Sequence, residues 1–470
     1  MSIRLYSKGG AEEVTGSRHF LSTPGGTLQI DCGAFQGRRK EAEAKNRAFE
    51  GNNSHPDAVI LTHAHFDHSG LLPLMAKNGY RGNIYATPAT RDLAGLIMLD
   101  SAKIQARDIE FLTKQAEKRG ENFQGEALFD EQDALTAMNQ FVTVSYGREI
   151  FVQRDISCRF YDSGHILGSS IAYLSVKNNG TATDIAFTGD LGRKNKPIIR
   201  DPERIPTPDY LVLESTYGDR LHEDTGTVMN HLAEVINRTA GRGGRVIIPA
   251  FAIERTQELI YYIHLLLDQK KISPIPVYLD SPMAVNATSI FQIHPECYDR
   301  ETYEAFTRHH ANPFGFNDMN YITHVEKSKA LNDKKEPIIL ISADGMCEAG
   351  RIRHHLVHGI TDPRNTVLIV GYMAAHTLGR RIRDREKEVK IFGQTFPLKA
   401  EVEEINALSA HADYRELGEY VSAMDLKKLK EVFLVHGEEK AREHLKSHLL
   451  GLGVSRVTAL RYGEEYELTN

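Results

Sequence analysis

Short runs of consecutive apolar residues recur along the chain, and several of them end at a histidine or a carboxylate. The run from Ala58 to Leu61 leads directly into Thr62-His63-Ala64-His65-Phe66-Asp67-His68. Later runs lead into four more such groups, namely His165, Asp190, Glu214 and His436. Continuous apolar runs of this length are typical of buried strands. Because a polar group recurs at the strand end each time, the pattern predicts that these side chains gather in one site.

The pattern changes after Tyr217. Apolar strands are expected at residues 244–249, 276–281, 337–342 and 365–371, and they alternate with helices at 228–238 and 254–267. Such alternation is typical of a parallel sheet covered on both faces. The sequence therefore predicts an α/β chain with a second domain at 216–394, flanked by ligand-bearing parts at 1–215 and 395–470.

Three other segments carry weaker patterns. The first 25 residues are rich in glycine and turn residues, and the strand that follows ends at Asp31. Residues from about 90 to 140 combine helical apolar spacing with many charges, which predicts a helical excursion. No apolar run is long enough to cross a membrane, and the N-terminus lacks the apolar segment of a signal peptide. We therefore expect no membrane partner.

Composition adds two constraints. The chain has 470 residues, of which 41% are hydrophobic and 26% charged, as expected for a soluble protein of two or more domains. Its net charge of -6 counts mildly against a nucleic-acid partner, although a basic groove can lie on an acidic body. The cysteines form no C-x-x-C pair, which fits a reduced cytoplasmic protein: they are Cys32, Cys158, Cys297 and Cys347.

The groups at the strand ends have the chemistry of metal ligands. They comprise five imidazoles and two carboxylates: His63, His65, Asp67, His68, His165, Asp190 and His436. One zinc ion takes about four ligands, so this set is too large for one ion and suits two Zn²⁺. Two ions about 3.5–4 Å apart can hold a hydroxide for in-line attack at phosphorus. Manganese also fits as the active ion.

The ligands divide naturally into two groups that share a carboxylate. One group is His63, His65 and His165, the other is Asp67, His68 and His436, and Asp190 bridges them. Asp31 is expected to orient a ligand histidine rather than to bind metal. Taken alone, His165 also fits a core histidine and His436 a residue at a helix start. As members of the set, both are better explained as ligands.

Two further polar groups suggest acid–base chemistry. His411 follows Leu408-Ser409-Ala410 at a strand end, where it could protonate a leaving oxygen. Glu214 could hold that imidazole in position and raise its pKa. The competing interpretation gives both residues only a role in turn hydrogen bonds.

These motifs resemble those of the metallo-β-lactamase superfamily, and within it the β-CASP family of nucleic-acid-processing nucleases. The metal motifs are His63-x-His65-x-Asp67-His68, Gly164-His165-Ile166-Leu167-Gly168 and Thr188-Gly189-Asp190. Glu214, Ser409-Ala410-His411 and Val435-His436-Gly437-Glu438 match the family's motifs A, B and C. The match covers nearly the whole chain. The motifs are similar to those of the endonuclease subunit of the eukaryotic cleavage and polyadenylation factor and of compact bacterial ribonucleases.

The resemblance implies a fold, an active site and a reaction. The fold is a four-layer αββα metallo-β-lactamase sandwich with an inserted β-CASP α/β domain and a site in the cleft between them. The reaction is zinc-dependent hydrolysis of single-stranded RNA that leaves a 5′-phosphate and a 3′-hydroxyl. Asp67, Glu214 and His411 would be catalytic, with His411 protonating the leaving 3′-oxygen. A histidine at motif C, here His436, goes with RNA rather than DNA nucleases.

The chain departs from the family pattern where substrate would bind. The family's Ser-Gly-Met-x-x-Gly-Gly is replaced by the segment from Ala343 to Gly350, which places acids at Asp344 and Glu348. His376 replaces the first glycine of Gly-Thr-Leu-Gly-Arg. Substrate contacts are therefore expected from Ser409 and from arginines of the core, for which the candidates are Arg351, Arg353, Arg380, Arg381 and Arg383.

Three other functions remain open on sequence alone. A small-molecule esterase or thioesterase can use the same metal core, but it does not need the long segment between Asp190 and His436. A non-catalytic scaffold is opposed by the complete set of ligands. A DNA nuclease is opposed by His436. The sequence leaves open whether attack is internal or from the 5′ end, which RNA is the target, and whether the chain forms a homodimer.

Overall fold

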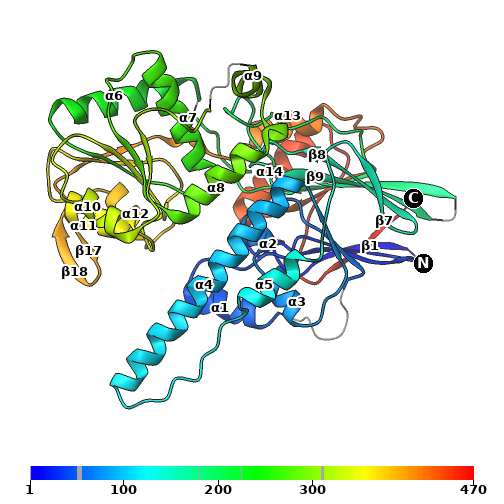
Figure 1. Ribbon diagram of the computed structural model, residues 1–470. Coiled ribbons are helices and arrows are strands. Elements are labelled where there is room, and N and C mark those ends of the chain that lie inside the picture. Colours follow the sequence, from blue (N-terminus) through cyan, green and yellow to red (C-terminus); the bar gives the residue numbers. More distant parts are fainter. Residues whose placement is uncertain (1, 50–55, 179, 224, 309–311, 470) are drawn as a thin grey trace. The chain divides into compact units, whose positions relative to one another are not determined.

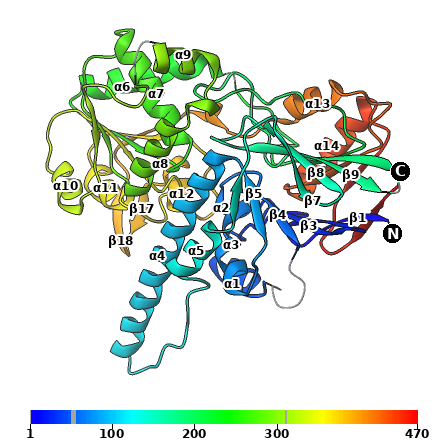
Figure 2. The same ribbon diagram turned by 45° about the vertical axis from the view of Figure 1, so that its right-hand side comes forward.

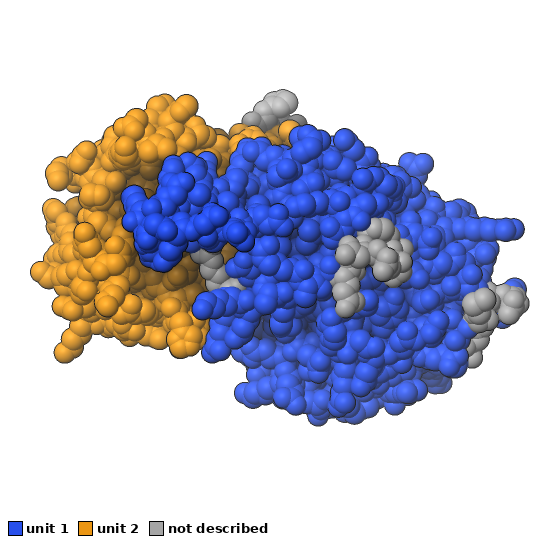
Figure 3. Space-filling view, turned by 90° about the horizontal axis from the view of Figure 1, so that it is seen from below, with its two compact units in different colours: residues 1–194, 201–221, 411–470 blue, residues 195–200, 222–410 orange. Residues whose placement is uncertain are grey.

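A computed structural model describes residues 2–49, 56–178, 180–223, 225–308 and 312–469. The chain forms two compact units, which Figure 3 colours separately. Unit 1 contains Met1–Lys194, Asp201–Leu221 and His411–Asn470, and unit 2 contains Asn195–Arg200 and His222–Ala410. Within the described residues, no helix is both long enough and apolar enough to cross a bilayer.

Unit 1 is built around two seven-stranded sheets (Figures 1 and 2). The first sheet has the order β22-β1-β2-β3-β4-β5-β6, with bounds β1 (Ile3–Ser7), β2 (His19–Thr23), β3 (Gly26–Ile30), β4 (Ala58–Ile60), β5 (Asn83–Ala86), β6 (Phe141–Thr143) and β22 (Glu465–Leu468). The second has the order β21-β20-β11-β10-β9-β8-β7, with bounds β7 (Glu149–Gln153), β8 (Ile156–Asp162), β9 (Ser170–Asn178), β10 (Thr181–Phe187), β11 (Tyr210–Glu214), β20 (Glu431–Val435) and β21 (Val457–Ala459).

The two sheets of unit 1 pack face to face. Leu28 and Ile60 of the first sheet share one buried cluster with Phe160, Phe187 and Phe433 of the second. Helices lie on the outer faces: α1 (Arg39–Arg47), α2 (Phe66–Ser69), α3 (Leu72–Lys77), α4 (Pro88–Lys118) and α5 (Glu131–Met138) beside the first sheet, and α13 (Tyr414–Ser422) and α14 (Glu439–Gly451) on the second. This is the expected αββα sandwich.

The first 25 residues are more regular than their turn-rich composition suggests. β1 and β2 pair in antiparallel register, Leu5 opposite Leu21, and both side chains are fully buried. In β1 only alternate side chains are buried, so the segment has few apolar residues although it is a strand. Glycine-rich loops around these strands obscure this short alternation in the sequence.

Unit 2 contains the parallel sheet that the second half of the sequence predicts. Its order is β14-β13-β15-β12-β16-β19 and every pair is parallel. The strands are β12 (Val246–Pro249), β13 (Val277–Leu279), β14 (Met319–Tyr321), β15 (Ile339–Ser342), β16 (Thr366–Ile369) and β19 (Glu401–Glu404), and β17 (Glu388–Ile391) and β18 (Gln394–Pro397) form a separate hairpin. The helices are α6 (Val228–Gly241), α7 (Arg255–Asp268), α8 (Pro282–Ile293), α9 (Arg300–Arg308), α10 (Val325–Leu331), α11 (Ile352–Gly359) and α12 (Leu378–Arg383), with short 3-10 turns η1 (Thr225–Thr227), η2 (Pro295–Cys297) and η3 (Asn406–Leu408).

The limits of unit 2 differ from the predicted boundaries of 216 and 394. β19 pairs with β16, so the chain completes this sheet before it returns to unit 1 at His411. β19 has the sequence Glu-Val-Glu-Glu, and an edge strand so rich in charge has no apolar run to reveal it. Residues 195–200 also belong to unit 2, since Lys196 Nζ lies 3.2 Å from Glu254 Oε1 and 3.4 Å from Glu258 Oε1.

Candidate metal centre

The candidate ligands stand at the ends of strands in unit 1. His63 and His65 follow β4, Asp67 and His68 lie on the short helix α2, and His165 lies in the turn after β8. Asp190 follows β10, and His436 follows β20 with a left-handed φ of 53°. The turns after β8 and β10 contain glycines in the left-handed region, Gly164 at a φ of 65° and Gly189 at 53°, because the backbone bends sharply there.

A close backbone approach holds α2 in place beneath the site. Cys32 N donates to His68 O at 2.7 Å, and Ala34 N donates to Phe66 O at 3.0 Å. A Cβ atom at Gly33 would lie 1.6 Å from the carbonyl oxygen of Asp67. Only glycine fits between these two loops, so Gly33 lets the loop after β3 fix the backbone that carries Asp67 and His68.

The first group of ligands surrounds one oxygen of Asp190. His63 Nε2 lies 3.3 Å and His165 Nε2 3.4 Å from Asp190 Oδ2, and His165 Nε2 lies 3.1 Å from His65 Nδ1. The side chains of His63 and His165 are fully buried. The four side chains therefore converge on one point.

The second group surrounds the other oxygen of Asp190. His68 Nε2 lies 3.4 Å and His436 Nδ1 3.5 Å from Asp190 Oδ1. His68 Nε2 is 3.1 Å from His436 Nε2, which is 3.5 Å from Asp67 Oδ2. Asp190 thus faces both groups, one oxygen toward each, as a bridging carboxylate does.

The donor set fits two divalent cations. Two ligands that each lie about 2.1 Å from a tetrahedral ion are about 3.4 Å apart, close to the separations within both groups. Among the described residues, His63 Nε2 and Asp190 Oδ1 are buried without a hydrogen-bond partner. Buried polar atoms in a native protein are normally satisfied, so these two atoms indicate a missing partner.

The electrostatics of the site favour a bound cation. Burial lowers the pKa of His63, His65 and His165, that of His65 to about 3, which keeps these imidazoles neutral as metal binding requires. Burial opposes a charge on Asp190, but the positive charges of His436 and His68 outweigh it and hold the Asp190 pKa well below its ordinary value.

The pKa of His68 shifts in the opposite direction to that of the other three histidines. Burial disfavours its charged form, but the carboxylates of Asp190 and Asp31 outweigh that effect and raise the His68 pKa well above its ordinary value. The negative charge that favours a proton on His68 also favours a divalent cation at the same place. A cation and a proton therefore compete for this imidazole.

Asp31 orients two ligands at once. Asp31 Oδ2 accepts from His68 Nδ1 at 2.7 Å, which leaves His68 Nε2 facing the site. Thr62 Oγ1 donates to Asp31 and lies 3.1 Å from His63 Nδ1, so His63 also presents Nε2. On the other side, Thr216 Oγ1 lies 3.0 Å from His436 Nδ1. The sequence predicts a role for Asp31 but not for Thr62 and Thr216, whose only signal is a position one residue before His63 and two residues after Glu214.

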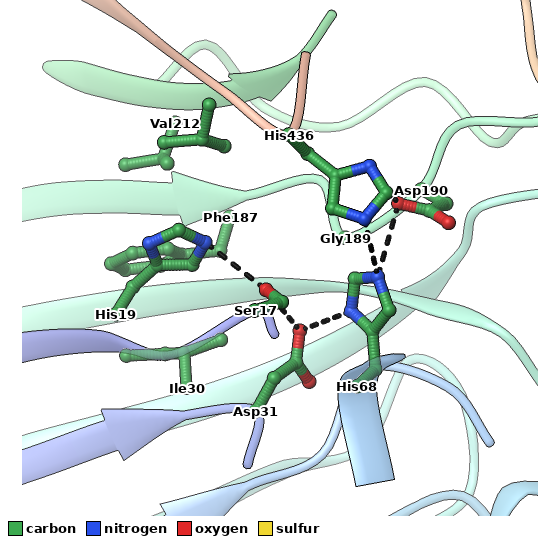
Figure 4. A pocket seen from close by; sticks show the side chains of 11 residues that line it. Ser17, His19, Ile30, Asp31, His68, Phe187, Gly189, Asp190, Val212 and His436 are labelled. Carbon is green, nitrogen blue, oxygen red and sulfur yellow. Dashed lines mark hydrogen bonds and ion pairs between the residues drawn. The ribbon is translucent and has the colours of Figure 1, made fainter. Parts of the chain in front are cut away.

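A series of buried hydrogen bonds leads from Asp31 through Ser17 to His19 (Figure 4). Ser17 Oγ donates to Asp31 Oδ2 at 3.4 Å and lies 3.1 Å from His19 Nε2, and Ser7 Oγ lies 2.6 Å from His19 Nδ1. Burial lowers the pKa of His19 to about 3, so the ring is neutral. Because the Ser17 proton goes to Asp31, His19 donates through Nε2 and accepts from Ser7 through Nδ1. No pattern in the sequence predicts these hydrogen bonds.

His411 and Glu214 form a pair beside the first group of ligands. His411 Nδ1 lies 3.1 Å from Glu214 Oε1 and 3.8 Å from Asp190 Oδ2. Glu214 is fully buried and also accepts from Leu191 N at 2.7 Å and Thr216 N at 3.2 Å. The His411 side chain remains 20% exposed. Burial disfavours the charged form of His411, but the negative charges of Glu214 and Asp190 outweigh this effect and raise the His411 pKa to about 9.

The predicted substrate-binding residues lie in unit 2. Arg351 NH1 lies 2.6 Å from Asp280 Oδ1, Arg380 Nε is 2.8 Å from Asp384 Oδ2, and Arg381 NH2 is 2.7 Å from Glu386 Oε2. Arg383 pairs with Glu404, and Arg353 NH1 donates to Glu348 O. Ser409 follows η3 in the same unit. Each of Arg351, Arg380, Arg381 and Arg383 thus has a carboxylate partner within its own unit.

The two acids that depart from the family pattern serve the loop after β15. Asp344 accepts from the backbone N–H groups of Met346, Glu348 and Ala349 at 2.9–3.1 Å. Glu348 Oε1 accepts from Leu378 N at 2.5 Å, at the start of α12. The Asp344 carboxylate therefore occupies three backbone N–H groups of its own loop.

Family models match three parts of the chain. The model of the metallo-beta-lactamase superfamily matches residues 19–110, and that of the Beta-Casp domain matches residues 256–382. The model of the Zn-dependent metallo-hydrolase RNA specificity domain matches residues 395–458. Together these segments include most of the metal ligands and His411.

Similar proteins match along nearly the whole chain. Ribonuclease TTHA0252 of Thermus thermophilus is 35% identical over 463 residues, which cover 98% of this chain and 99% of that protein. The transcription termination factor FttA of Methanosarcina mazei is 32% identical over 457 residues, 95% of this chain and 68% of FttA. A solved protein of unknown function from Enterococcus faecalis V583 shares the fold, with a TM-score of 0.56 at 12% identity and full coverage of both chains.

Proposed function

The chain belongs to the β-CASP ribonuclease family of the metallo-β-lactamase superfamily and is a metal-dependent hydrolase, and from this we propose that it hydrolyses phosphodiester bonds of single-stranded RNA with two Zn²⁺. The products would carry a 5′-phosphate and a 3′-hydroxyl. The observation that carries the proposal is Asp190, whose two oxygens face two separate groups of ligands.

The chain's own residues would hold the ions and position the substrate. His63, His65 and His165 form one site, Asp67, His68 and His436 form the other, and Asp190 joins them. Bound zinc supplies a Lewis acid for the phosphodiester and lowers the pKa of the attacking water. Asp67, whose side chain is 18% exposed, is placed at the open edge of the second group, where it can orient that water.

His411 is proposed as the general acid. Its Nδ1 is engaged by Glu214 at 3.1 Å, so Nε2 would be the nitrogen that donates to a leaving oxygen. Glu214 is fixed in turn by two backbone N–H groups, those of Leu191 and Thr216. The acid is thereby held in one orientation, and its exposed side is the side that a substrate could reach.

RNA is proposed as the substrate because of the relatives. One similar protein is named a ribonuclease, and the model that matches residues 395–458 is described as an RNA specificity domain. That segment contains His411 and His436. The four cysteines are buried free thiols, which suits the reducing cytoplasm as the proposed location.

The test is an incubation of metal-analysed protein with 5′-labelled single-stranded RNA and with DNA of the same sequence. We expect RNA cleavage and about two zinc ions per chain, with a product ladder that separates internal from end-directed attack. Asp67→Ala should lose one metal equivalent and cleavage, whereas Asp57→Asn, outside the site, should retain both. Intact RNA with a full metal load would reject the ribonuclease proposal, and preferential cleavage of DNA would reject the substrate.

A further inference from the structure

An aromatic ring lies on the surface of unit 2 with a cation and an imidazole against it. Phe392 is at the tip of the hairpin formed by β17 and β18 (Figures 1 and 2), and it is 47% exposed although Val389 and Ile391 of the same hairpin are buried. The guanidinium carbon of Arg353 lies 4.2 Å from the ring centroid. The His354 ring lies 4.7 Å away at an interplanar angle of 36°. The ring is therefore held in position while it stays open to solvent.

Lysines lie on and beside the hairpin that carries this ring. Residues 351–400 contain ten lysines and arginines but only four acidic residues, in a chain whose net charge is -6. Several of the arginines are neutralised by carboxylate partners. Lys387, Lys390 and Lys399 are exposed, and none of them has an ion pair among the described residues. Unpaired positive charge therefore remains on and next to this hairpin.

The ring also lies near the ligand-binding end of its sheet. Arg353 NH1 donates to Glu348 O, in the loop that follows β15. Ligands of parallel α/β sheets bind at the carboxyl ends of the strands, because the loops there form the crevice. The Arg353–Phe392 stack is thus attached to the same loops that a ligand of this sheet would contact.

We propose that Phe392, Arg353 and His354 form a stacking platform for one base of single-stranded RNA. This inference rests on the proposed ribonuclease function and names a part of the substrate path in unit 2. Proteins that bind single strands combine aromatic faces for the bases with positive charge for the phosphates. A protein partner fits less well, because the cores of protein interfaces are depleted in lysine.

The ionisation of His354 agrees with a stacking role. Its partial burial, followed by the charges of His355 and Arg353, lowers the pKa of His354 below its ordinary value. The ring is therefore neutral at physiological pH and presents a flat aromatic surface. Arg353 supplies the positive charge of the platform.

The first test measures binding of the full chain to a labelled single-stranded RNA, in a His411→Ala background that keeps the RNA intact. Phe392→Ala should weaken binding about tenfold, and Phe392→Tyr, which keeps the aromatic face, should restore it. Phe151→Ala is the matched control, because Phe151 is 62% exposed on β7 of unit 1. Equal affinity of Phe392→Ala and the background protein would overturn the platform.

A second measurement identifies stacking itself. Single abasic sites are placed in turn along the RNA, and one of them should weaken binding about tenfold when Phe392 is present but not in Phe392→Ala. The same profile in both proteins would refute stacking on this ring. If the chain with His411 cleaves RNA while Phe392→Ala binds normally, the platform alone fails. If that chain neither binds nor cleaves RNA, the proposed function fails and the platform with it.

Discussion

The two carboxylate oxygens of Asp190 lie near different histidine rings. Oδ2 lies near His63 and His165, and Oδ1 lies near His68 and His436, at 3.3–3.5 Å in every case. A single carboxylate can therefore connect two cation sites whose other ligands come from different strand ends. At this scale the chemistry depends on which nitrogen each ring presents, and Asp31 and Thr62 decide this for His68 and His63.

The role of His411 can be separated from metal binding. We expect His411→Ala to retain its metal and to lose cleavage by about 10²–10⁴-fold, because it removes the proposed proton donor but no member of the two ligand groups. Metal content by mass spectrometry and single-turnover rates measure the two effects. His444→Ala is the control, since His444 bonds to Gly218 O outside the site. A fully active His411→Ala protein would remove the proposed role.

Asp31 should control metal affinity rather than chemistry. Asp31→Asn weakens the acceptor that orients His68 and, through Thr62, His63. We expect metal affinity to fall about 10–100-fold, measured by competition with a chelator, while excess zinc restores the rate. Asp57→Asn serves as control, because Asp57 accepts from Thr27 N at the start of β3, at the other end of this strand from Asp31. Unchanged affinity would show that Asp31 does not orient these ligands.

At the scale of elements, strands with continuous apolar sequences could be predicted together with the polar residues at their ends, whereas solvent-exposed strands could not. Apolar runs identify β4, β10, β11, β12, β15 and β20, and the polar residue that follows each of the first-unit runs is brought into one site. The edge strand β19 and the hairpin of β17 and β18 escape this reasoning because half or more of their residues face solvent. Thr62 and His19 escape it because a hydrogen bond between distant loops leaves no periodic pattern.

A buried carboxylate connects three elements of unit 2. Asp280, which follows β13, is fully buried and accepts from Arg351 NH1 and His355 Nε2, each at 2.6 Å, and from Ser328 Oγ. Burial raises the Asp280 pKa, but the bonds from His355, Ser328 and Arg351 outweigh it and the Asp280 pKa falls below its ordinary value. The folded state therefore binds the ionised form more strongly than the unfolded state does.

Asp280→Asn should destabilise the protein by about 3 kcal/mol at pH 7, because it removes the buried negative charge that Arg351 and two further donors bind. The contribution of Asp280 is complete above the unfolded-state pKa of about 3.9 and is lost as the pH falls toward the lower folded-state value. The difference from wild type in urea unfolding should therefore shrink below about pH 4. Asp362→Asn, which breaks a surface pair with Arg364, should cost less than about 1 kcal/mol. A constant difference at all pH values would contradict this linkage.

At the scale of the whole molecule, the chain passes between the two units four times. The crossings lie at 194/195, 200/201, 221/222 and 410/411. The short passage through 195–200 is anchored by Lys196, whose side chain is only 3% exposed between Glu254 and Glu258. Ile198 and Ile199 are buried as well, and Asp299 N donates to Ile198 O at 2.7 Å.

Lys196→Ala should loosen this passage, because it removes a buried cation shared by Glu254 and Glu258, although Glu258 keeps its pair with Arg255. We expect trypsin to cut next to Lys194 or Arg200 at least tenfold faster than in wild type, followed by mass analysis of the fragments. Lys194→Ala, which removes an exposed ion pair with Glu419, should not accelerate cleavage at Arg200. Equal proteolysis of Lys196→Ala and wild type would show that other contacts hold the passage.

Unit 2 therefore cannot be removed by deleting residues 222–410 alone. Deleting residues 222–410 would remove Glu254, Glu258 and Tyr298, and would strip the cover from Ile198 and Ile199 while leaving them in the chain. Residues 195–200 begin only a few positions after Asp190. A shortened protein would therefore expose an apolar segment a few residues after the candidate ligand Asp190. Any minimal version of this enzyme must therefore redesign residues 195–200 together with the deletion.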